Sequence, residues 1–368
     1  MIGTYGKSER LSLALRELYR SYGYRQYKVG KFEEYDLYAR NRNFLTGEHI
    51  LTFSDTDGRL MALKPDVTLS IIKNTRGDDR IRKVWYTENV YRVPRNAYGF
   101  QEILQTGLEC IGPVDLYTMA EVLMLAARSL ETISGEYILG ISHLGILTGV
   151  LKAEGVPAAL SARILTAIGE KNPHSLRALC REGAIREEAA SLLSALCQLS
   201  GPADGALPRL LALPLPAESL AAAEELAGIC AALRVFGAFR VKLDLSVISD
   251  TDYYNGLVFR GFVDGVAAPV LSGGRYDRLL NRMGKPGSAI GFAVYLSELE
   301  RFLSEAGGPD FDVLLTYGED SDPAAVAARA KALVAEGRTV RVQPAGESAV
   351  TCREHIALEG KEDGACPA

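Results

Sequence analysis

Four polar side chains fall at strand-like spacing in two neighbouring stretches. In QEILQTGLE, Gln105 and Glu109 point to one side because residues two apart share a strand face, and Gly107 between them is expected to leave an open floor. Glu88 and Arg92 likewise share one face of KVWYTENVYR. If the two faces coincide, the sheet carries a pocket floor of carboxylate, amide and guanidinium groups. The same spacing is equally typical of a solvated face with ion pairs, which contribute only about 0 to 1 kcal/mol each.

Two adjacent tyrosines, Tyr253 and Tyr254, stand in the stretch VISDTDYYNGLVF. Asp252 precedes them and an Asn-Gly pair follows, which indicates a strand edge that contains a turn. The centre of this edge is polar and aromatic, although tyrosines in strands most often serve ordinary packing. The pair by itself therefore leaves packing and ligand binding open.

Two shorter motifs are weaker when they stand alone. Asp66 and Thr68, in LKPDVT, lie where a strand is expected to give way to a helix, and a helix cap explains them better than a ligand does when they stand alone. Gly273 and Gly274, in SGGRYD, permit close backbone approach to a ligand, yet glycine pairs are common in turns.

The elements that would position these residues alternate between helix and strand. A helix is predicted from Ser8 to Gly23, and the stretch ILTFSDTDGRLMAL predicts a hairpin with a two-residue turn at Asp57-Gly58. A short helix should start near Asp66, two strands should flank the loop PRNAYG, and Asp115 should cap a long amphipathic helix before the strand EYILGIS.

The remaining chain divides by composition. Residues 151–235 are rich in alanine and leucine and predict a helical insertion into a core of residues 1–150 and 236–303. Strands should return in FRVKLDLSVIS, GLVFRGFVDG and AAPVLSGGRYD, followed by a last helix from Ser288 to Leu303. Residues 310–345 predict a small α/β unit, and residues 346–368 a polar tail.

Composition excludes several classes of protein. With 368 residues, 48% hydrophobic and 24% charged, the chain is an ordinary globular one, and no stretch approaches the roughly 20 apolar residues of a membrane span. We expect it to be cytoplasmic. The six cysteines form no C-x-x-C pair, and no metal or cofactor site stands out. The net charge is −5, so the chain lacks the excess of positive charge that a large nucleic-acid-binding surface needs.

Taken in order, the motifs resemble the catalytic core of histidyl-tRNA synthetase, a class II synthetase. The resemblance rests on LKPDVT, ENVYR, QTGLECIG, the helical insertion, DTDYYNGLVF, SGGRYDRLL and SAIGFAVYL, and it covers nearly all of residues 1–303. It implies an α+β fold with a six-stranded antiparallel sheet flanked by helices, and a dimer. It also implies a histidine pocket in which Asp66, Thr68, Gln105 and Glu109 hold the amino-acid end.

The resemblance assigns the remaining motif residues as well. Tyr253 and Tyr254 would close around the imidazole ring, and Arg92 lies where the family places an arginine that contacts phosphate. This chain differs from the synthetase family at positions that act on the nucleotide. Ser249 occupies the position of a family arginine that assists amino-acid activation, and Glu298 that of a family arginine that grips ATP. Pro94 stands where a glutamate belongs. Replacing attraction by repulsion at about 4 Å changes the interaction energy by roughly 8 kcal/mol at an effective dielectric near 20. Efficient adenylate formation is therefore not expected.

A chain that keeps the histidine pocket but has lost residues of the ATP site resembles the family of ATP phosphoribosyltransferase regulatory subunits. This resemblance implies no catalysis by the chain itself, assembly with a short-form catalytic subunit, and feedback regulation by histidine of the first step of histidine biosynthesis. Stable tRNA binding is not expected, because the segment after TVRVQ is short for an anticodon-binding domain. Two alternatives stay open: a divergent histidyl-tRNA synthetase and a stand-alone histidine-binding paralogue.

Overall fold

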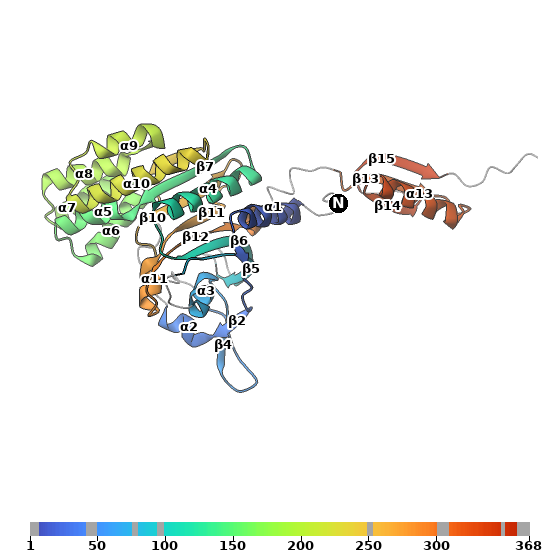
Figure 1. Cartoon of the computed structure of the whole chain (residues 1–368), viewed down its shortest axis with the longest axis horizontal. Coiled ribbons are helices and arrows are strands. Elements are labelled where there is room, and N and C mark those ends of the chain that lie inside the picture. The colour runs from blue at the N-terminus through green and yellow to red at the C-terminus, as the bar shows by residue number, and fades with distance from the viewer. Residues whose placement is uncertain are drawn as a thin grey trace, which may run out of the picture. The chain divides into compact units, whose positions relative to one another are not determined.

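The chain divides into two units. Residues Leu11–Leu299 are built around a large sheet, and the C-terminal segment is built around a small sheet and belongs to the second unit. The computed structural model describes residues 7–41, 50–75, 80–93, 99–248, 253–299, 309–346 and 350–358. Figure 1 shows the elements along the chain.

Within the described residues the large sheet has nine strands in the order β1-β5-β6-β12-β11-β10-β7-β9-β8. These are β1 Arg25–Gln26, β5 Arg82–Arg92, β6 Gln101–Gly112, β7 Tyr137–His143, β8 Ser200–Pro202, β9 Val241–Asp244, β10 Leu257–Val263, β11 Leu271–Arg275 and β12 Ser288–Tyr295. The six strands from β5 to β7 are antiparallel to their neighbours. Because β1 and β9 add parallel pairs, the sheet is mixed and larger than the predicted six antiparallel strands.

One face of this sheet packs beneath two helices, α1 Lys7–Ser21 and α4 Leu116–Ile133. Tyr19 of α1 meets Phe292 of β12 edge to face at 5.9 Å, and its hydroxyl lies 3.0 Å from the Ser129 hydroxyl of α4. Leu108 and Trp85 are fully or almost fully buried on this face. Burial of each such large apolar side chain contributes about 2 kcal/mol, so this layer anchors the sheet.

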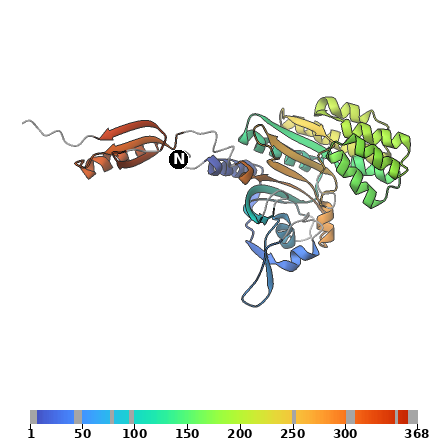
Figure 2. The same cartoon turned by 180° about the vertical axis from the view of Figure 1, so that it is seen from behind.

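The opposite face carries smaller elements. They are α2 Tyr35–Arg40, α3 Thr68–Asn74, α11 Asp277–Arg282 and a three-stranded sheet of β2 Phe32–Glu34, β3 Thr52–Ser54 and β4 Leu60–Leu63. Figures 1 and 2 show α1 and α4 on one side of the large sheet and α2 and α3 on the other. The buried side chains of Tyr86, Ile71 and Tyr276 belong to one apolar cluster between these layers.

Local signals place several elements as predicted. Asp115 caps α4 by accepting a hydrogen bond from the Thr118 amide at 2.8 Å. The hairpin between β3 and β4 also forms, but its loop has three residues rather than two, because Asp55 and Arg59 still pair and Gly58 takes a φ of 77°.

The predicted helix from Ser288 to Leu303 is wrong over its first half. Ser288–Tyr295 is the strand β12, which pairs with β6 and β11 in the middle of the sheet. Helical backbone begins only at Leu296. A short apolar run such as AIGFAV fits a buried strand and a buried helix equally well, so periodicity alone did not separate them.

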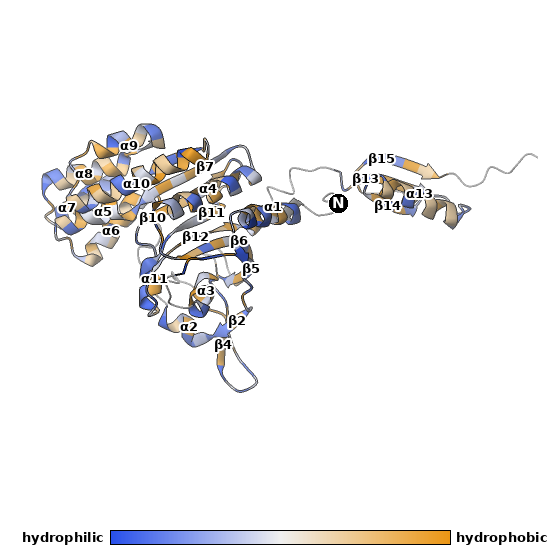
Figure 3. Ribbon diagram, viewed as in Figure 1, coloured by the Kyte–Doolittle hydropathy of each residue, from blue (hydrophilic) through white to orange (hydrophobic). Residues whose placement is uncertain are grey.

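The alanine- and leucine-rich segment is mostly helical, interrupted by the short strand β8, and its helices begin before residue 151. It contains α5 Leu144–Ala153, α6 Ala158–Gly169, α7 Pro173–Glu182, α8 Glu187–Gln198, α9 Ala203–Leu211 and α10 Ala217–Phe236. Helix α10 packs on α4 and α5, which ties the segment to the core. Figure 3 shows hydrophobic residues, in orange, to be frequent in α10 and near β7.

In its described residues, the C-terminal unit is a three-stranded parallel sheet with one helix. Its elements are β13 Phe311–Tyr317, α13 Pro323–Ala335, β14 Val340–Pro344 and β15 Cys352–Leu358. The prediction of a polar tail from residue 346 is wrong for Cys352–Leu358, because this segment pairs with β13. Across the described ranges, none of the helices is both long and apolar enough to span a bilayer.

Candidate functional site

Glu109 lies at the centre of a buried polar cluster on the face of the sheet opposite α1 and α4. Its side chain projects from β6 and is only 2% exposed. The Thr68 hydroxyl donates to Oε1 at 2.7 Å, and the Tyr276 hydroxyl donates to Oε2 at 2.6 Å. Three residues that are far apart in the sequence therefore meet at one carboxyl group.

Burial governs the protonation of Glu109. Loss of hydration raises the pKa of this carboxyl to about 8, the hydrogen bonds from Thr68 and Tyr276 oppose the rise, and the nearby charge of Asp66 adds to it. At neutral pH the group is therefore mostly protonated, and one hydroxyl neighbour can turn to accept its proton. A cation placed against it would favour the ionised form.

Asp66 lies at the start of α3 beside this cluster. Its Oδ1 accepts from the Leu69 amide at 2.8 Å, so Asp66 holds the first turn of α3 from the residue before the N-cap Val67. Its Oδ2 lies 3.8 Å from Arg92 Nη2. Burial raises the pKa of Asp66, whereas the Arg92 charge lowers it. The side chain is 13% exposed.

The register shows that the two strand faces coincide, a condition that the spacing had left open. Glu88 lies directly opposite Gln105, and Arg92 lies opposite Gln101, so all of these side chains share the face of Glu109. Gln105 is buried. Glu88, in contrast, is held by the buried Lys64 at 2.6 Å, so it forms a structural ion pair.

The tyrosine pair stacks above this floor. The ring centroids of Tyr253 and Tyr254 are 4.7 Å apart, and those of Tyr253 and Tyr276 are 5.8 Å apart. Both tyrosines of the pair are half-buried. A Cβ at Gly274 would come within 2.6 Å of the Tyr254 ring, which explains one glycine of SGGRYD as a close approach.

The expectation of an open floor at Gly107 is wrong. A Cβ built there would lie 2.7 Å from the Tyr86 hydroxyl, so the phenol ring of Tyr86 fills the space above this glycine. A Cβ at Gly291, opposite Glu109 on β12, would overlap the Glu109 carboxyl group. Both glycines therefore leave room for the protein's own side chains.

Three contributors to the site were missed in the sequence: Tyr86, Tyr276 and Gly291. A signal existed for Tyr276, since it follows Arg275 in SGGRYD, and for Tyr86, since it lies two residues before Glu88 and thus on the same face. Gly291 could be found only from the register of β12 with β6, which the helix prediction for that segment concealed.

The structure does not place every residue that the motifs singled out in this cluster. Ser249, Asp252 and Pro94 lie outside the described residues. Glu298 is exposed on the helical segment after β12. A search of the described residues finds no group of three or more histidine, cysteine, aspartate or glutamate side chains that could hold a metal ion.

These groups suit a small ligand that carries an ammonium group and a flat ring. Asp66 and Glu109 offer carboxyl oxygens, Thr68 offers a hydroxyl, and the tyrosines offer ring faces and phenol groups.

Known proteins give the class and the family. Residues 4–299 match the family model for histidyl-tRNA synthetase. A crystal structure from Bacillus halodurans C, described as an ATP phosphoribosyltransferase regulatory subunit/histidyl-tRNA synthetase, superposes on this chain with a TM-score of 0.77 at 23% identity. The superposition covers 96% of this chain and 94% of that one. A chain of the ATP phosphoribosyl transferase complex from Thermotoga maritima superposes with a TM-score of 0.62 at 22% identity, covering 79% of this chain and 97% of that one. These likenesses show the class II synthetase-like fold.

Sequence relatives are more specific. The ATP phosphoribosyltransferase regulatory subunit of Desulforamulus reducens is 30% identical over 83% of this chain and 78% of its own length. The subunit of the same name from Acetivibrio thermocellus is 29% identical over 94% of this chain and 85% of its own length. The chain belongs to the family of ATP phosphoribosyltransferase regulatory subunits, which confirms the resemblance seen in the motif order.

Proposed function

We propose that this chain is the non-catalytic regulatory subunit of an ATP phosphoribosyltransferase and that the pocket around Glu109 binds histidine as its effector. Together with a short-form catalytic subunit, it would support the first step of histidine biosynthesis in the cytoplasm. The observation that carries the histidine site is the buried Glu109 carboxyl group, held by Thr68 and Tyr276 beneath the tyrosine pair.

The polar groups divide between the two ends of histidine. Asp66, Thr68, Gln105 and Glu109 would hold the amino-acid end, since a carboxylate that hydrogen-bonds an ammonium group gains more than a neutral pair does. Tyr253 and Tyr254 would close around the imidazole ring with their faces and hydroxyl groups. Arg92, already near Asp66, would stay at the edge of the ligand toward any phosphate-bearing molecule.

The state of Glu109 supports a sensor for a cation. Because burial raises its pKa to about 8, the carboxyl is mostly neutral at pH 7 when no cation is near. The ammonium group of a bound amino acid would lower that pKa, so binding would release a proton. The empty pocket thus avoids an unpaired buried charge, and the filled pocket gains an ion pair.

The substitutions in the nucleotide site support a role without catalysis. Ser249 and Glu298 stand where the synthetase family has two arginines for amino-acid activation, so ATP would lose two cationic contacts. The pocket would then bind histidine without forming an adenylate. Self-association as a dimer and absence of stable tRNA binding complete the proposal.

Regulation of the partner requires a difference in affinity. The Thermotoga maritima structure is that of a complex, and a short-form catalytic subunit is the partner we propose for this chain. Histidine must bind the inhibited form of that complex better than the active form. A difference of about 1 to 3 kcal/mol gives roughly 5- to 150-fold inhibition.

Calorimetric titration of histidine into the isolated chain tests the pocket. Glu109→Gln keeps the shape of the neutral acid but cannot ionise, so we expect histidine affinity to fall about 10- to 100-fold, the range for a lost charged hydrogen bond. Glu102→Gln, an exposed change on the same strand, serves as the matched control and should bind like the wild type. Equal affinity in the two variants would move histidine to another place, such as an interface with the partner.

Two further measurements separate the alternatives. A divergent histidyl-tRNA synthetase would exchange pyrophosphate into ATP in the presence of histidine, and we expect only background exchange. A stand-alone histidine-binding protein would neither co-purify with a short-form catalytic subunit nor activate it, and we expect both. Robust exchange, or failure of both partner assays, would overturn the proposed function even if histidine binds.

A further inference from the structure

Three cationic side chains converge on a second cavity, far along the same sheet face from Glu109. The cavity has a volume of about 390 Å³ and lies where β7, β9 and β10 meet the end of α6. Its lining includes Lys171 from the residues after α6, Lys242 from β9 and Arg260 from β10. Lys242 and Arg260 both lie opposite Gly140 of β7, so their side chains share a face.

The carboxylate of Asp244 pairs with two of these three cations. Asp244 Oδ2 lies 2.7 Å from Lys171 Nζ and 3.4 Å from Lys242 Nζ, so two ammonium groups share one oxygen. Asp244 Oδ1 is taken by the amide and hydroxyl of Ser246, at 3.1 and 2.6 Å. Burial acts to raise the pKa of Asp244, but the hydrogen bonds from Lys171 and Ser246 prevail and lower it, so the group is ionised.

Arg260 brings donors that the protein uses only in part. Its Nη2 donates to the Ile248 carbonyl at 2.9 Å, and among the described residues no carboxylate oxygen lies within salt-bridge distance of its guanidinium group. A guanidinium has five N–H donors, so most of them remain for another acceptor. Among the residues that the structure describes, the lining therefore carries three positive charges against one negative charge.

Lys171 holds a backbone conformation that favours glycine. It follows α6 with a φ of 51°, and its amide and that of Asn172 bond to the carbonyls of Ile168 and Ala167, as in a Schellman motif. Ala184, with a φ of 49°, occupies the same position after α7, away from the cavity. At Lys171 the strained conformation carries a side chain that reaches Asp244 and the cavity.

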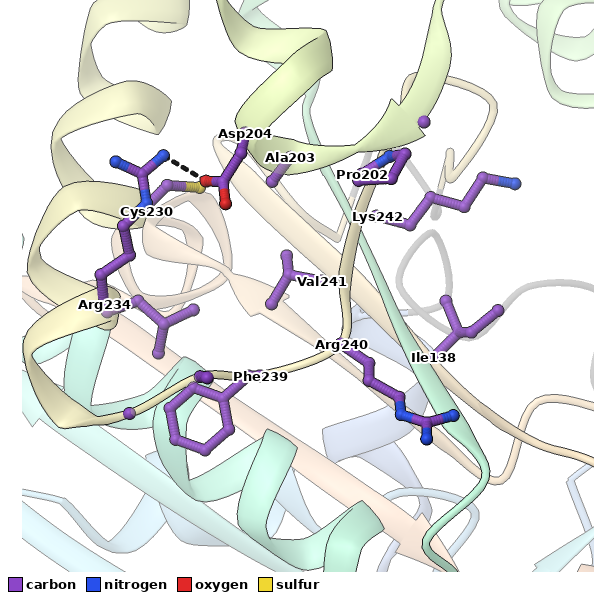
Figure 4. A pocket seen from close by; sticks show the side chains of 14 residues that line it. Ile138, Pro202, Ala203, Asp204, Cys230, Arg234, Phe239, Arg240, Val241 and Lys242 are labelled. Carbon is purple, nitrogen blue, oxygen red and sulfur yellow. Dashed lines mark hydrogen bonds and ion pairs between the residues drawn. The ribbon is translucent and has the colours of Figure 1, made fainter.

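The cavity adjoins a larger apolar pocket. That pocket, of about 820 Å³, is lined by Phe239, Val241 and Leu233, and it shares Ile138 and Lys242 with the cationic cavity. Figure 4 shows that the Lys242 side chain extends away from Phe239 and Arg234. The charged end of Lys242 is thus directed away from the apolar lining.

We propose that the cavity between Lys171, Lys242 and Arg260 binds the phosphoryl group of a small molecule. The excess of two positive charges matches a phosphate group, which carries about −1.5 to −2 at pH 7, better than a carboxylate. A volume of 390 Å³ lies within the range of about 300 to 1,000 Å³ that is typical of small-molecule sites, so it has room for more than the anion alone.

Calorimetry of the full chain with inorganic phosphate and with glycerol 3-phosphate tests this site, with acetate as the monoanion for comparison. We expect both phosphate compounds to bind more tightly than acetate and to weaken as salt increases. Lys242→Gln and Arg260→Gln should each weaken binding about tenfold or more. Preference for glycerol 3-phosphate indicates a phosphorylated metabolite as the natural ligand, and preference for inorganic phosphate indicates the free ion.

A matched pair of variants separates the side chain of Lys171 from its backbone. Lys171→Gly and Ala184→Gly relieve the same conformation, but only the first removes a cation from the cavity, so only the first should weaken phosphate binding. The proposal is overturned if phosphate binds no better than acetate, if the cavity variants bind like the wild type, or if Arg92→Gln alone abolishes binding. That last result would place the anion beside Asp66 instead.

Discussion

The Glu109 cluster and the Lys171 cavity share one face of one sheet, yet they handle charge in opposite ways. Glu109 is 2% exposed, hydrogen-bonded to two hydroxyls, and its pKa is raised to about 8 by burial. Asp244 is 8% exposed, but the lysines that share its oxygen are 49% and 39% exposed, and its pKa is lowered. The central carboxyl is neutral, and the one near the sheet edge is ionised.

The difference follows from what covers each part of the sheet. Over β6 and β12 the apolar cluster that includes Tyr86 and Tyr276 excludes water, so an unpaired charge is costly there. At β9 the two lysines remain partly in water, and a charge is stabilised by solvent as well as by its partners. Under the two proposals, the centre of the sheet responds to a cation or a proton, whereas the edge selects ligands by charge balance.

The largest difference in stability between the two regions should come from replacing one glycine by alanine in each of them. In Gly291→Ala the new Cβ would overlap the Glu109 carboxyl and lie 2.5 Å from the Leu108 carbonyl, so we expect a loss of about 3 kcal/mol or more in the free energy of unfolding. In Gly140→Ala, on the same face near the edge, the nearest atom is Val247 Cγ2 at 3.3 Å, and the loss should stay below about 1 kcal/mol. Urea denaturation of the two variants measures both, and similar losses would contradict a tightly packed centre.

Over a single pH unit, the next largest effect is the pH dependence of stability that Glu109 contributes. Because its pKa is raised from 4.5 to about 8 on folding, the native state keeps a proton that the unfolded state releases. Stability is thus greatest below about pH 4.5 and falls as pH rises toward 8, by about 1.4 kcal/mol per pH unit for one group. Glu109→Gln lacks this titration, so it should gain stability relative to the wild type as pH increases. Parallel curves for the two proteins would mean that the native carboxyl is already ionised.

The parts of the site that the sequence predicts are those fixed by local rules. The period of two placed Gln105 and Glu109 on one face, and the long hairpin of β5 and β6 brought Glu88 opposite Gln105. Asp66 and Asp115 sit where side-chain oxygens cap helices. These relations span few residues or a single hairpin, so no knowledge of the tertiary structure was needed.

The parts that escaped prediction depend on distant pairing and on side-chain direction. The outer strands β1 and β8 have two and three residues, too few to show a period, and they exist because a neighbour offers hydrogen bonds. The strand β15 alternates weakly because most of its side chains are exposed. The filled floor at Gly107 depends on the direction of the Tyr86 ring across the strand pair, which spacing does not give.

The smallest expected effect concerns the two strained residues at helix ends. Ala184→Gly removes a side chain from a left-handed conformation, and relief of this strain should outweigh the entropy that glycine adds to the unfolded chain, with a net gain of about 0.5 to 1 kcal/mol. Lys171→Gly gains the same relief but loses the ion pair with Asp244, which is worth at most about 1 kcal/mol because the lysine is 49% exposed. We therefore expect Lys171→Gly to be close to neutral in urea denaturation and to fall below Ala184→Gly. If both variants gain equally, the Lys171–Asp244 contact contributes nothing to stability, and the side chain would be kept at this position for its ligand alone.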